Sequence, residues 1–441
     1  MTFPFQGGVH PEGHKDATQQ KPIELLPPPA QVVLPVSMHI GAPCEPLVKV
    51  GQHVLLGEKI AMSASPVSAP IHASVSGTVA AVEPRPHPNG GRVPAIVLEN
   101  DGADTPHPDI RPFGSAEALT AEDLIAVIRE AGLVGLGGAA FPTHTKIASG
   151  LGKIDTLIVN GAECEPYITS DHRVMLETPE EILGGLRALM KIYGLESAVI
   201  AVETNKPDAV ETLRRTLPKR GGGVRVAPLA TRYPQGAEKQ LIRAVTGREV
   251  PPGALPAAVG AAVFNVDTVA SIHRAVTAGT PLLRRVVTVS GSAVSNPKNL
   301  SVRLGTPLRA VFEATGGFRE QPFKIIMGGP MMGVAQHNLD APVIKGTNAL
   351  LAFSREEGKP EKEPVCIRCG RCVSACPMRL LPVYLYHYEQ KNMLAECERM
   401  RISDCIECGS CAYICPGRLH LVHSFRTAKQ KLREAQKRGG N

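Results

Sequence analysis

The chain has 441 residues, of which 43% are hydrophobic and 20% are charged. At roughly 150 residues per domain this length predicts about three domains, and the composition excludes wholesale disorder and a fibrous repeat. The longest uncharged stretches are interrupted by prolines, so we expect no transmembrane helix, and the first residues lack the basic and apolar regions of a signal peptide. The protein is therefore expected to stay in the cytoplasm.

Basic residues are concentrated at one end of the chain. The formal net charge is +7, and the stretch from Arg418 to Asn441 contributes +6 of it, with seven lysines and arginines against Glu434. The rest of the chain is almost neutral and contains no Trp, which disfavours nucleic-acid binding. We interpret the tail (426–441) as a solvated helix end, with contact to a membrane surface or a partner subunit as the alternative.

The N-terminal part, residues 1–110, is expected to be a β domain. Between residues 31 and 100, short Val- and Ile-rich segments are separated by Gly and Pro, a pattern typical of strands and turns. This part resembles the barrel-sandwich domain of biotinyl and lipoyl carriers. Such carriers need a lysine at a hairpin tip, and no lysine lies between Lys59 and Lys146. We therefore expect an unmodified structural or docking module.

Residues 115–280 alternate between helix and strand patterns. Thr120 and Asp123 form a predicted capping box for the first helix, and Gly132 is its stop signal. The alternation predicts a mainly parallel sheet with helices on both faces. The further elements expected are, in chain order, a strand at 155–160, a helix at 178–194, a strand at 197–203, a helix from 207, a strand at 224–230 and a helix at 236–245.

Ligands bind such sheets beyond the carboxyl ends of the strands. The loops to search therefore begin at Asn160, Glu203 and Tyr233. In the first loop, NGAECEP (160–166), two carboxylates follow a strand, where they would bind ribose hydroxyls, steer a nicotinamide or stay solvated. No His or Asn neighbour supports Cys164 as a nucleophile.

The segment GLGGAAFPTHTK (135–146) matches the letters of the dinucleotide fingerprint G-x-G-x-x-A. A Rossmann fingerprint follows a strand and opens a helix, whereas this segment follows a predicted helix and soon reaches Pro142. What remains is a glycine-rich loop whose backbone can approach a flat or anionic ligand closely, with Lys146 available for a phosphate. A plain tight turn is the alternative.

Residues 281–353 return to β patterns and include a short predicted helix from about 307 to 314, so we expect a small β-grasp-like domain. The segment 354–364 is charged, holds two prolines and is interpreted as a linker. A compact cysteine-rich domain is expected at 365–425.

Eight of the eleven cysteines belong to two motifs between Cys366 and Cys415, each with the spacing C-x2-C-x2-C-x3-C-P of two-cluster ferredoxins. Three thiolates spaced three positions apart can wrap three irons of one cubane, while the fourth, turned away by the proline, ligates the other cluster. Two [4Fe–4S] clusters are therefore predicted, one held by Cys366, Cys369, Cys372 and Cys415 and the other by Cys376, Cys405, Cys408 and Cys411.

A pair of four-cysteine zinc sites is the alternative, although zinc has no need of a third cysteine at the same spacing in both motifs. Because the chain shows no export signal, we expect the cysteines to be reduced rather than paired in disulfides. Cys44 and Cys397 lie outside the motifs and are expected to be packed or exposed thiols.

Together these motifs resemble one family, the RnfC subunits of ion-translocating ferredoxin:NAD oxidoreductases. The matching segments extend over nearly the whole chain: GGVHPEGHK, HASVSGTV, PRPHPNG, GLGGAAFPTHTK, NGAECEPYITSDHR, YPQGAEKQL, FNVDT, GGPMMG and both cysteine motifs. The core is in turn similar to the NADH-binding flavoprotein subunit of respiratory complex I. The resemblance implies a multidomain α/β chain with a barrel-sandwich β domain, a Rossmann-like FMN/NADH core, a β-grasp, SLBB-like domain and a C-terminal helical two-cluster ferredoxin domain.

The resemblance also implies particular cofactor contacts. Phe141 and Glu165 match positions that contact NADH in the complex I subunit. The implied FMN contacts are Gly135, Gly137 and Lys146 on the phosphate side, and Asn160, Glu163, Tyr233, Gly236, Glu238, Asn265 and Thr268 around the ribityl chain and the ring. The chain departs from the complex I pattern at Leu136 (an arginine there), Ala140 (a glycine), Ala162 and Ala237 (both acidic).

The implied function is that of a peripheral subunit on the cytoplasmic side of the cell membrane, which passes electrons between NAD(H), FMN and two [4Fe–4S] clusters in a redox-driven ion translocase. Its partners would be the other subunits of the membrane complex and, indirectly, ferredoxin; no acid-base pair is required. One alternative is a soluble flavin and iron-sulfur cobalamin reductase of a bacterial microcompartment. The other is a non-enzymatic ferredoxin-like relay without FMN, which Leu136 and Ala162 motivate.

Overall fold

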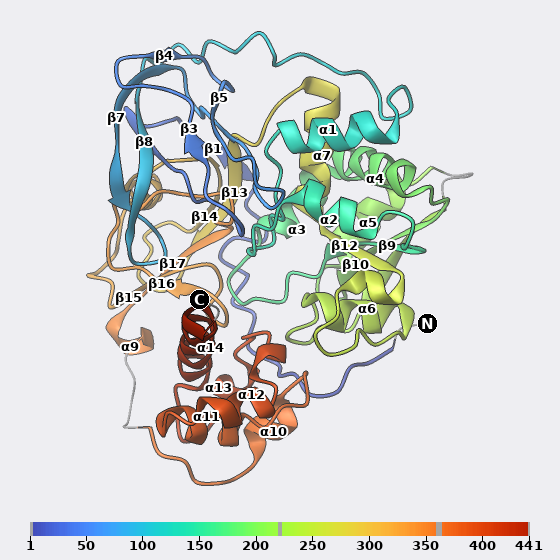
Figure 1. Ribbon diagram of the computed structural model, residues 1–441, viewed down its shortest axis with the longest axis vertical. Coiled ribbons are helices and arrows are strands. Elements are labelled where there is room, and N and C mark those ends of the chain that lie inside the picture. The colour runs from blue at the N-terminus through green and yellow to red at the C-terminus, as the bar shows by residue number, and fades with distance from the viewer. Residues whose placement is uncertain (1–2, 219–222, 359–363, 440–441) are drawn as a thin grey trace.

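A computed structural model describes residues 3–218, 223–358 and 364–439 of the chain. Figure 1 shows a β domain in blue at the upper left, an α/β core in green at the right, a second β domain in yellow and orange below the first, and a helical domain in red at the bottom. The chain enters between two of these parts: the backbone N–H of Phe3 donates to Ala244 of the core, and that of Gly8 donates to Ala375 of the helical domain.

The α/β core is built on a four-stranded parallel sheet with the strand order β11-β10-β9-β12. The central strands are almost continuous runs of buried Val, Ile, Leu and Ala, as expected for a parallel sheet that is covered on both faces. The four strands are β9 (Thr156–Gly161), β10 (Ala198–Glu203), β11 (Val224–Leu229) and β12 (Ala261–Asn265).

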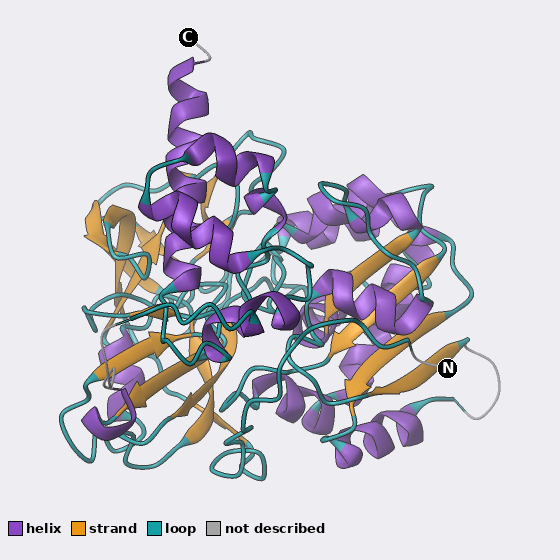
Figure 2. Cartoon of the chain, turned by 90° about the horizontal axis from the view of Figure 1, so that it is seen from below, coloured by secondary structure: helices purple, strands orange, loops and turns teal. Residues whose placement is uncertain are grey.

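Helices flank this sheet on both sides (Figure 2). Their ends follow local signals, including the capping box between Thr120 and Asp123 and the left-handed Gly194 that ends α4. Four of these helices, α2, α3, η1 and α7, are not among the elements expected from the sequence. The helices of the core are α1 (Ala121–Glu130), α2 (Thr143–Gly150), α3 (Ser170–Glu177), α4 (Pro179–Tyr193), α5 (Pro207–Thr216), α6 (Glu238–Thr246), the 3-10 helix η1 (Pro256–Val259) and α7 (Val266–Ala278).

The first β domain packs two antiparallel sheets around a core that includes Val32, Leu34, Ile96 and Leu98. Within the expected range 1–110 the barrel begins only at β2, because the preceding β1 (Ile23–Leu25) pairs with a strand of the other β domain. The barrel strands are β2 (Gln31–Pro35), β3 (Glu45–Pro46), β4 (His53–Val54), β5 (Lys59–Met62), β6 (Ile71–His72), β7 (Gly77–Pro86) and β8 (Arg92–Asn100).

The second β domain is a six-stranded mixed sheet with the order β1-β14-β13-β17-β15-β16. Its strands are β13 (Arg284–Ser290), β14 (Lys298–Arg303), β15 (Lys324–Met327), β16 (Val334–Ala335) and β17 (Ala349–Phe353), and its helices are α8 (Leu308–Glu313) and α9 (Arg355–Gly358). The expected linker 354–364 thus begins with a helical turn, and its residues 359–363 lie outside the described part of the chain.

The C-terminal domain consists of short helices held together by one long helix, α14. In Figure 2 the end of α14 projects from the rest of the molecule. The expected boundary between domain and tail at 425/426 falls inside this continuous helix. None of the helices in the described ranges is long and apolar enough to span a bilayer. The helices are α10 (Arg371–Ala375), α11 (Pro382–Gln390), α12 (Leu394–Arg399), the 3-10 helix η2 (Ile402–Asp404), α13 (Ser410–Tyr413) and α14 (Leu421–Gly439).

A buried amine joins the two β domains to the core. Lys345 is 1% exposed, and its Nζ donates to the backbone oxygens of Pro70 in the barrel, at 2.6 Å, and of Gly132 after α1, at 2.8 Å. Burial lowers its pKa from 10.5 to about 7. Three segments far apart in the sequence therefore meet at one side chain.

This amine predicts a pH-dependent stability. Between pH 7 and 10 the unfolded chain keeps the Lys345 amine protonated while the folded chain releases the proton, so this group adds stability as the pH rises. In Lys345→Met this contribution is absent. The apparent melting temperature of wild type minus that of the variant should therefore increase from pH 7 to pH 10. Lys324→Met, at an exposed lysine, is the control, and parallel curves for wild type and Lys345→Met would contradict the assignment.

Candidate cofactor sites

Two asparagines mark the carboxyl edge of the parallel sheet. Asn160 in β9 and Asn265 in β12 are register partners at the ends of neighbouring strands. The amide nitrogen of Asn160 donates to the backbone oxygen of Gly236 at 2.9 Å, which fixes the loop before α6 against the sheet. The Asn265 side-chain oxygen caps α7 by accepting from the N–H groups of Asp267 and Thr268.

The glycine-rich loop 135–141 lies against this edge. Gly137 lies beside Asn265, because a Cβ built on Gly137 would be in ordinary van der Waals contact with the Asn265 side chain, at 3.5 Å from its Cβ. The N–H of Leu136 donates to the Thr268 hydroxyl at 2.8 Å. Contrary to the expectation from Pro142, the loop does open a helix, because Pro142 occupies the N-cap of α2 and lacks only an N–H that the helix does not use.

A buried ion pair holds the glycine-rich loop in place. Arg285 of β13 contacts Asp267 of α7 at 2.5 Å and donates to the backbone oxygen of Leu136 at 2.7 Å, and both charged side chains are buried. Because a buried charge that loses its partner is strongly destabilising, this pair fixes the second β domain, α7 and the glycine-rich loop in one arrangement. Leu136, which stands in place of an arginine, is itself buried.

Polar groups remain available at this edge for a ligand. Lys146 of α2 forms an ion pair with Glu238 at the start of α6, and both side chains are about one-third exposed. The Thr143 hydroxyl and the Gln235 amide nitrogen are buried without a hydrogen-bond partner among the described residues. A group with a phosphate and polar ring edges fits a site with these donors, since buried polar groups are normally paired.

The other expected contact residues take part in further interactions within the chain. The Glu163 carboxylate caps α3 by accepting from the N–H of Asp171 at 2.8 Å and from that of His172 at 3.4 Å. The Tyr233 hydroxyl contacts the helical domain at Cys408, and the Glu165 carboxylate contacts Tyr233 and Met331 of the second β domain. Gly135 and Phe141 face each other across the glycine-rich loop, where the N–H of Gly135 donates to the Phe141 oxygen at 2.8 Å.

The eight motif cysteines line two separate cavities. Each cavity takes three sulfurs from one motif and the fourth from the other motif. The first, of about 500 Å³, is lined by Cys366, Cys369, Cys372 and Cys415. The second, which is smaller, is lined by Cys376, Cys405, Cys408 and Cys411.

The sulfurs of the second cavity are buried, so a positive charge is needed beside them to stabilise them as thiolates. Burial raises the pKa of the Cys405 thiol to about 11 and also raises the pKa values of Cys376, Cys408 and Cys411. A metal cluster supplies the charge that stabilises the thiolates in such a place. In the described residues, no three His, Cys, Asp or Glu side chains gather around one point as they would for a single ion.

The second motif loop is anchored to the core through Tyr233. The Tyr233 hydroxyl donates to the backbone oxygen of Cys408 at 2.6 Å and lies 3.3 Å from the carboxylate of Glu165. Burial raises the pKa of Glu165 to about 7, although its carboxylate also accepts from the N–H of Met331 at 3.1 Å. Val9 of the N-terminal segment pairs with the Tyr233 backbone from the other side.

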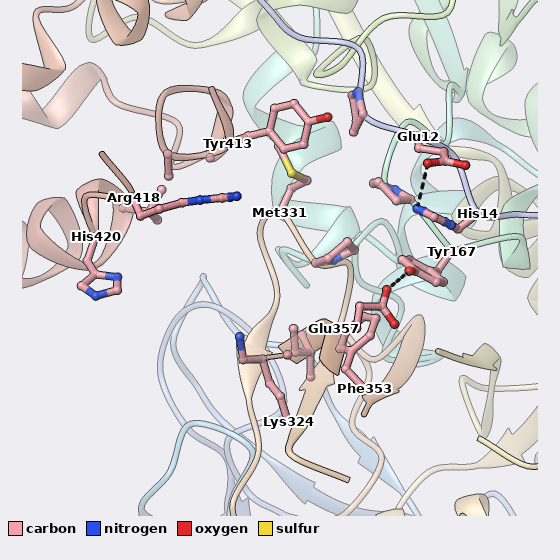
Figure 3. A pocket seen from close by; sticks show the side chains of 18 of the residues that line it. Glu12, His14, Tyr167, Lys324, Met331, Phe353, Glu357, Tyr413, Arg418 and His420 are labelled. Atoms are coloured by element: carbon pink, nitrogen blue, oxygen red, sulfur yellow. Dashed lines mark hydrogen bonds and ion pairs between the residues drawn. The ribbon is translucent and has the colours of Figure 1, made fainter. Parts of the chain in front are cut away.

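A cavity of about 820 Å³ lies beside this junction, with walls from the N-terminal segment, the core, the second β domain and the helical domain. Figure 3 shows Met331, Tyr413 and Arg418 on one side of it and His14 and Tyr167 on the other. The rings of His14 and Tyr167 are stacked with centroids 4.7 Å apart, and both residues have positive φ angles, of 47° and 67°. Two strained residues are thus held at this wall.

Several site residues could not be identified from the sequence. Thr143 could not be recognised as a site residue, because no helix was expected after Pro142. Arg285 and Asp267 looked like ordinary charged residues of a strand and a helix, since the ion pair joins segments 18 positions apart in two domains. The only sequence signal for this ion pair was the position of Arg285, which directly precedes the apolar run of the strand pattern RRVVTVS.

Four family models match successive parts of the chain, and they confirm the fold class expected from the sequence. They are described as the RnfC barrel sandwich hybrid domain (residues 3–103), the Nuo51 FMN-binding domain (128–274), the SLBB domain (286–335) and the 4Fe-4S dicluster domain (360–416).

Similar proteins extend over almost the whole chain. The C-subunit of the Na+-translocating ferredoxin:NAD+ oxidoreductase complex of Acetobacterium woodii is 48% identical over 99% of this chain and 98% of its own length. The corresponding subunit of the proton-translocating complex of Clostridium ljungdahlii is 47% identical over 90% and 87%. That of the ion-translocating oxidoreductase complex of Rhodobacter capsulatus is 44% identical over 99% and 85%.

A solved NAD+-reducing [NiFe]-hydrogenase in the air-oxidised state shares the fold with a TM-score of 0.52 at 18% identity, over 71% of this chain and 63% of that chain. The fold and the sites thus define a flavin-binding, iron-sulfur oxidoreductase subunit. The sequence identity to these subunits extends over nearly the full length and shows the particular family: the chain belongs to the RnfC family.

The backbone conformation of Ala140 in the glycine-rich loop predicts an unusual order of thermal stability among variants at this position. Ala140 has a φ of 51°, a left-handed conformation that costs a non-glycine residue about 1–2 kcal/mol. Ala140→Gly should therefore raise the apparent melting temperature, whereas Ala140→Val, with a β-branched side chain at the same φ, should lower it. Thermal unfolding of the two variants beside wild type checks the order, and equal stability of the glycine and valine variants would contradict it.

Proposed function

We propose that this chain is the subunit of an ion-translocating ferredoxin:NAD+ oxidoreductase complex that exchanges electrons with NAD(H). Membership of the RnfC family supports the class of complex, and the matches to an FMN-binding domain and a 4Fe-4S dicluster domain support the cofactors. When bound, FMN exchanges a hydride with NAD(H) and single electrons with iron-sulfur clusters. The chain's own contribution is to hold these groups in one rigid frame.

The carboxyl edge of the parallel sheet is the proposed FMN site. Its support is the convergence of the glycine-rich loop with the loops before α6 and α7, together with the buried, unpartnered Thr143 and Gln235 among the described residues. The residues proposed to hold FMN are Gly135, Gly137, Lys146, Asn160, Gly236, Glu238, Asn265 and Thr268. Glu163 contributes indirectly, because its carboxylate fixes α3 beside Asn265.

For NAD(H) we propose Phe141 and Glu165, as the resemblance implies. Glu165 is mostly buried, so its contact with a nucleotide needs an opening between Met331 and Tyr233, whose N–H and hydroxyl now contact its carboxylate. Deprotonated Glu165 would accept a hydrogen bond from the nucleotide, and the carboxyl is poised to change its protonation state near neutral pH.

The observation that carries the proposal is the contact between Tyr233 and Cys408. It joins the loop after β11 in the nucleotide core directly to the backbone of a cluster cysteine. A flavin at the sheet edge and a cluster in the second cavity would therefore belong to one packed unit rather than to two tethered domains. Such a unit suits electron exchange inside a single subunit.

We further propose that the subunit is peripheral and lies on the cytoplasmic side of the membrane. The absence of a membrane-spanning helix among the described residues is compatible with such a place. The other subunits of the complex are its proposed direct partners. Ferredoxin is connected to this chain indirectly through them.

The cluster assignment is tested by cysteine variants of anaerobically prepared protein. Wild type should contain about eight irons per chain, together with FMN that NADH reduces. Because each cavity takes one sulfur from the other motif, Cys376→Ser and Cys405→Ser should alter the same electron paramagnetic resonance signal, and Cys366→Ser should alter the other signal.

Cys397→Ser is the matched control, since Cys397 is buried but lines neither cavity, and it should retain the full iron content. If Cys376→Ser reproduced the effect of Cys366→Ser, the ligands would not be exchanged between the motifs. Stoichiometric zinc in place of iron, or no NADH-reducible flavin, would refute the proposed function.

A further inference from the structure

The two cysteine motifs form loops of the same shape. The first reads CIRCGRC (366–372) and the second CIECGSC (405–411). The third residue of each loop is left-handed, with φ angles of 55° for Arg368 and 56° for Glu407, and the fifth is a glycine, with φ angles of 75° and 79°. The chain therefore offers an internal comparison in which the surroundings of the two loops differ.

The second loop is covered by the rest of the protein. A Cβ on Gly409 would lie 2.7 Å from the backbone oxygen of Met331, and Cys408 is only 7% exposed. Glu407 forms ion pairs with Arg426 and Lys429 of α14. The backbone and the charged side chain of this loop thus have partners within the chain.

The first loop carries the same apolar residues but leaves them uncovered. Nothing lies within 4 Å of a Cβ built on Gly370 among the described residues, and Cys369 is exposed. Ile367 is 64% exposed, and two apolar neighbours, Val365 and Tyr384, are 61% and 53% exposed. Together with Arg368 and Arg371 these residues form what we call the open loop surface, at the mouth of the first cysteine cavity.

The open loop surface differs from the covered loop in charge as well as in exposure. In the first loop, Arg368 occupies the position that Glu407 has in the second loop, and Arg371 occupies the position of the fully buried Ser410. Neither arginine forms an ion pair within the described ranges, and the described lining of the first cavity contains Arg368 and His387 but no carboxylate. An apolar centre with a positive rim is the composition of a protein interface whose partner is negatively charged.

We propose that the open loop surface docks a one-electron carrier protein whose own cofactor lies beneath an acidic face with an apolar centre. The inference rests on the proposed function, because it needs a cluster in the first cavity. The second loop faces the core through Tyr233, so the first loop is the side on which the chain can exchange electrons with another protein. The partner covers Ile367 and Gly370 of the first loop, in the way that Met331 covers Gly409 of the second loop.

The proposal is tested with the full-length holoprotein and two probes of opposite charge. Because the isolated chain lacks the partner subunits, an acidic bacterial ferredoxin stands in for the acidic carrier, and basic cytochrome c is the probe of opposite charge. Wild type should bind the ferredoxin more tightly than cytochrome c, and the affinity should fall as salt is raised. The double variant Arg368→Glu, Arg371→Glu should bind the ferredoxin at least about tenfold more weakly, since a reversed charge repels the partner.

The matched control is Arg214→Glu, Arg215→Glu, which makes the same charge change at two arginines of α5 in the nucleotide core and should leave ferredoxin affinity unchanged. Equal weakening by both double variants would show a general charge effect and would overturn the proposal. Equal affinity of wild type for the two probes would overturn it as well.

A second readout needs no variant. Hydrogen exchange of wild type should slow at residues 365–372 when the ferredoxin is added and stay unchanged at 405–411. Protection elsewhere without protection at 365–372 would overturn the proposal. Iron content and the electron paramagnetic resonance spectrum are recorded on the same samples, so that missing clusters, which would refute the proposed function, are distinguished from clusters that are present but do not dock the probe.

Discussion

The hydrogen bond from the Tyr233 hydroxyl to the backbone oxygen of Cys408 is the contact on which the arrangement of the molecule depends. It is short, buried and made between two domains, and it joins residues 175 positions apart in the chain. Val9 pairs with the Tyr233 backbone, and a Cβ on Gly7 would collide with the backbone of Cys376. The N-terminal segment therefore binds both domains and holds the second cysteine loop on the core.

Buried basic side chains fix the remaining parts relative to this junction. Lys15 donates to the backbone oxygen of Glu165 at 2.9 Å, Lys345 to those of Pro70 and Gly132, and Arg285 to that of Leu136. Removing such polar groups from water is costly, whether they are charged or neutral, so their net gain in stability is small. Their value is specificity, because each satisfies carbonyl oxygens that only one relative placement of the segments brings together.

Local signals explain what could be predicted from the sequence. The capping box at Thr120, the left-handed Gly194 and the apolar strand runs act over a few residues, and the cysteine spacing reflects the shape of a cubane. Pro142 misled the prediction because proline also suits the start of a helix. The capping role of Glu163 and the buried pair of Arg285 with Asp267 depend on packing between distant segments, as does the contrast between two cysteine loops of almost identical sequence.

From the contact between Tyr233 and Cys408 we infer that the cluster bound by the second loop lies between the flavin and the cluster bound by the first loop. Rapid mixing of cysteine variants with NADH, followed by electron paramagnetic resonance of frozen samples, tests it most directly. In Cys369→Ser the remaining cluster should be reduced as fast as in wild type, whereas in Cys408→Ser the remaining cluster should be reduced much more slowly. Equal rates in the two variants, or the reverse order, would show that the second cluster does not lie between the flavin and the first cluster.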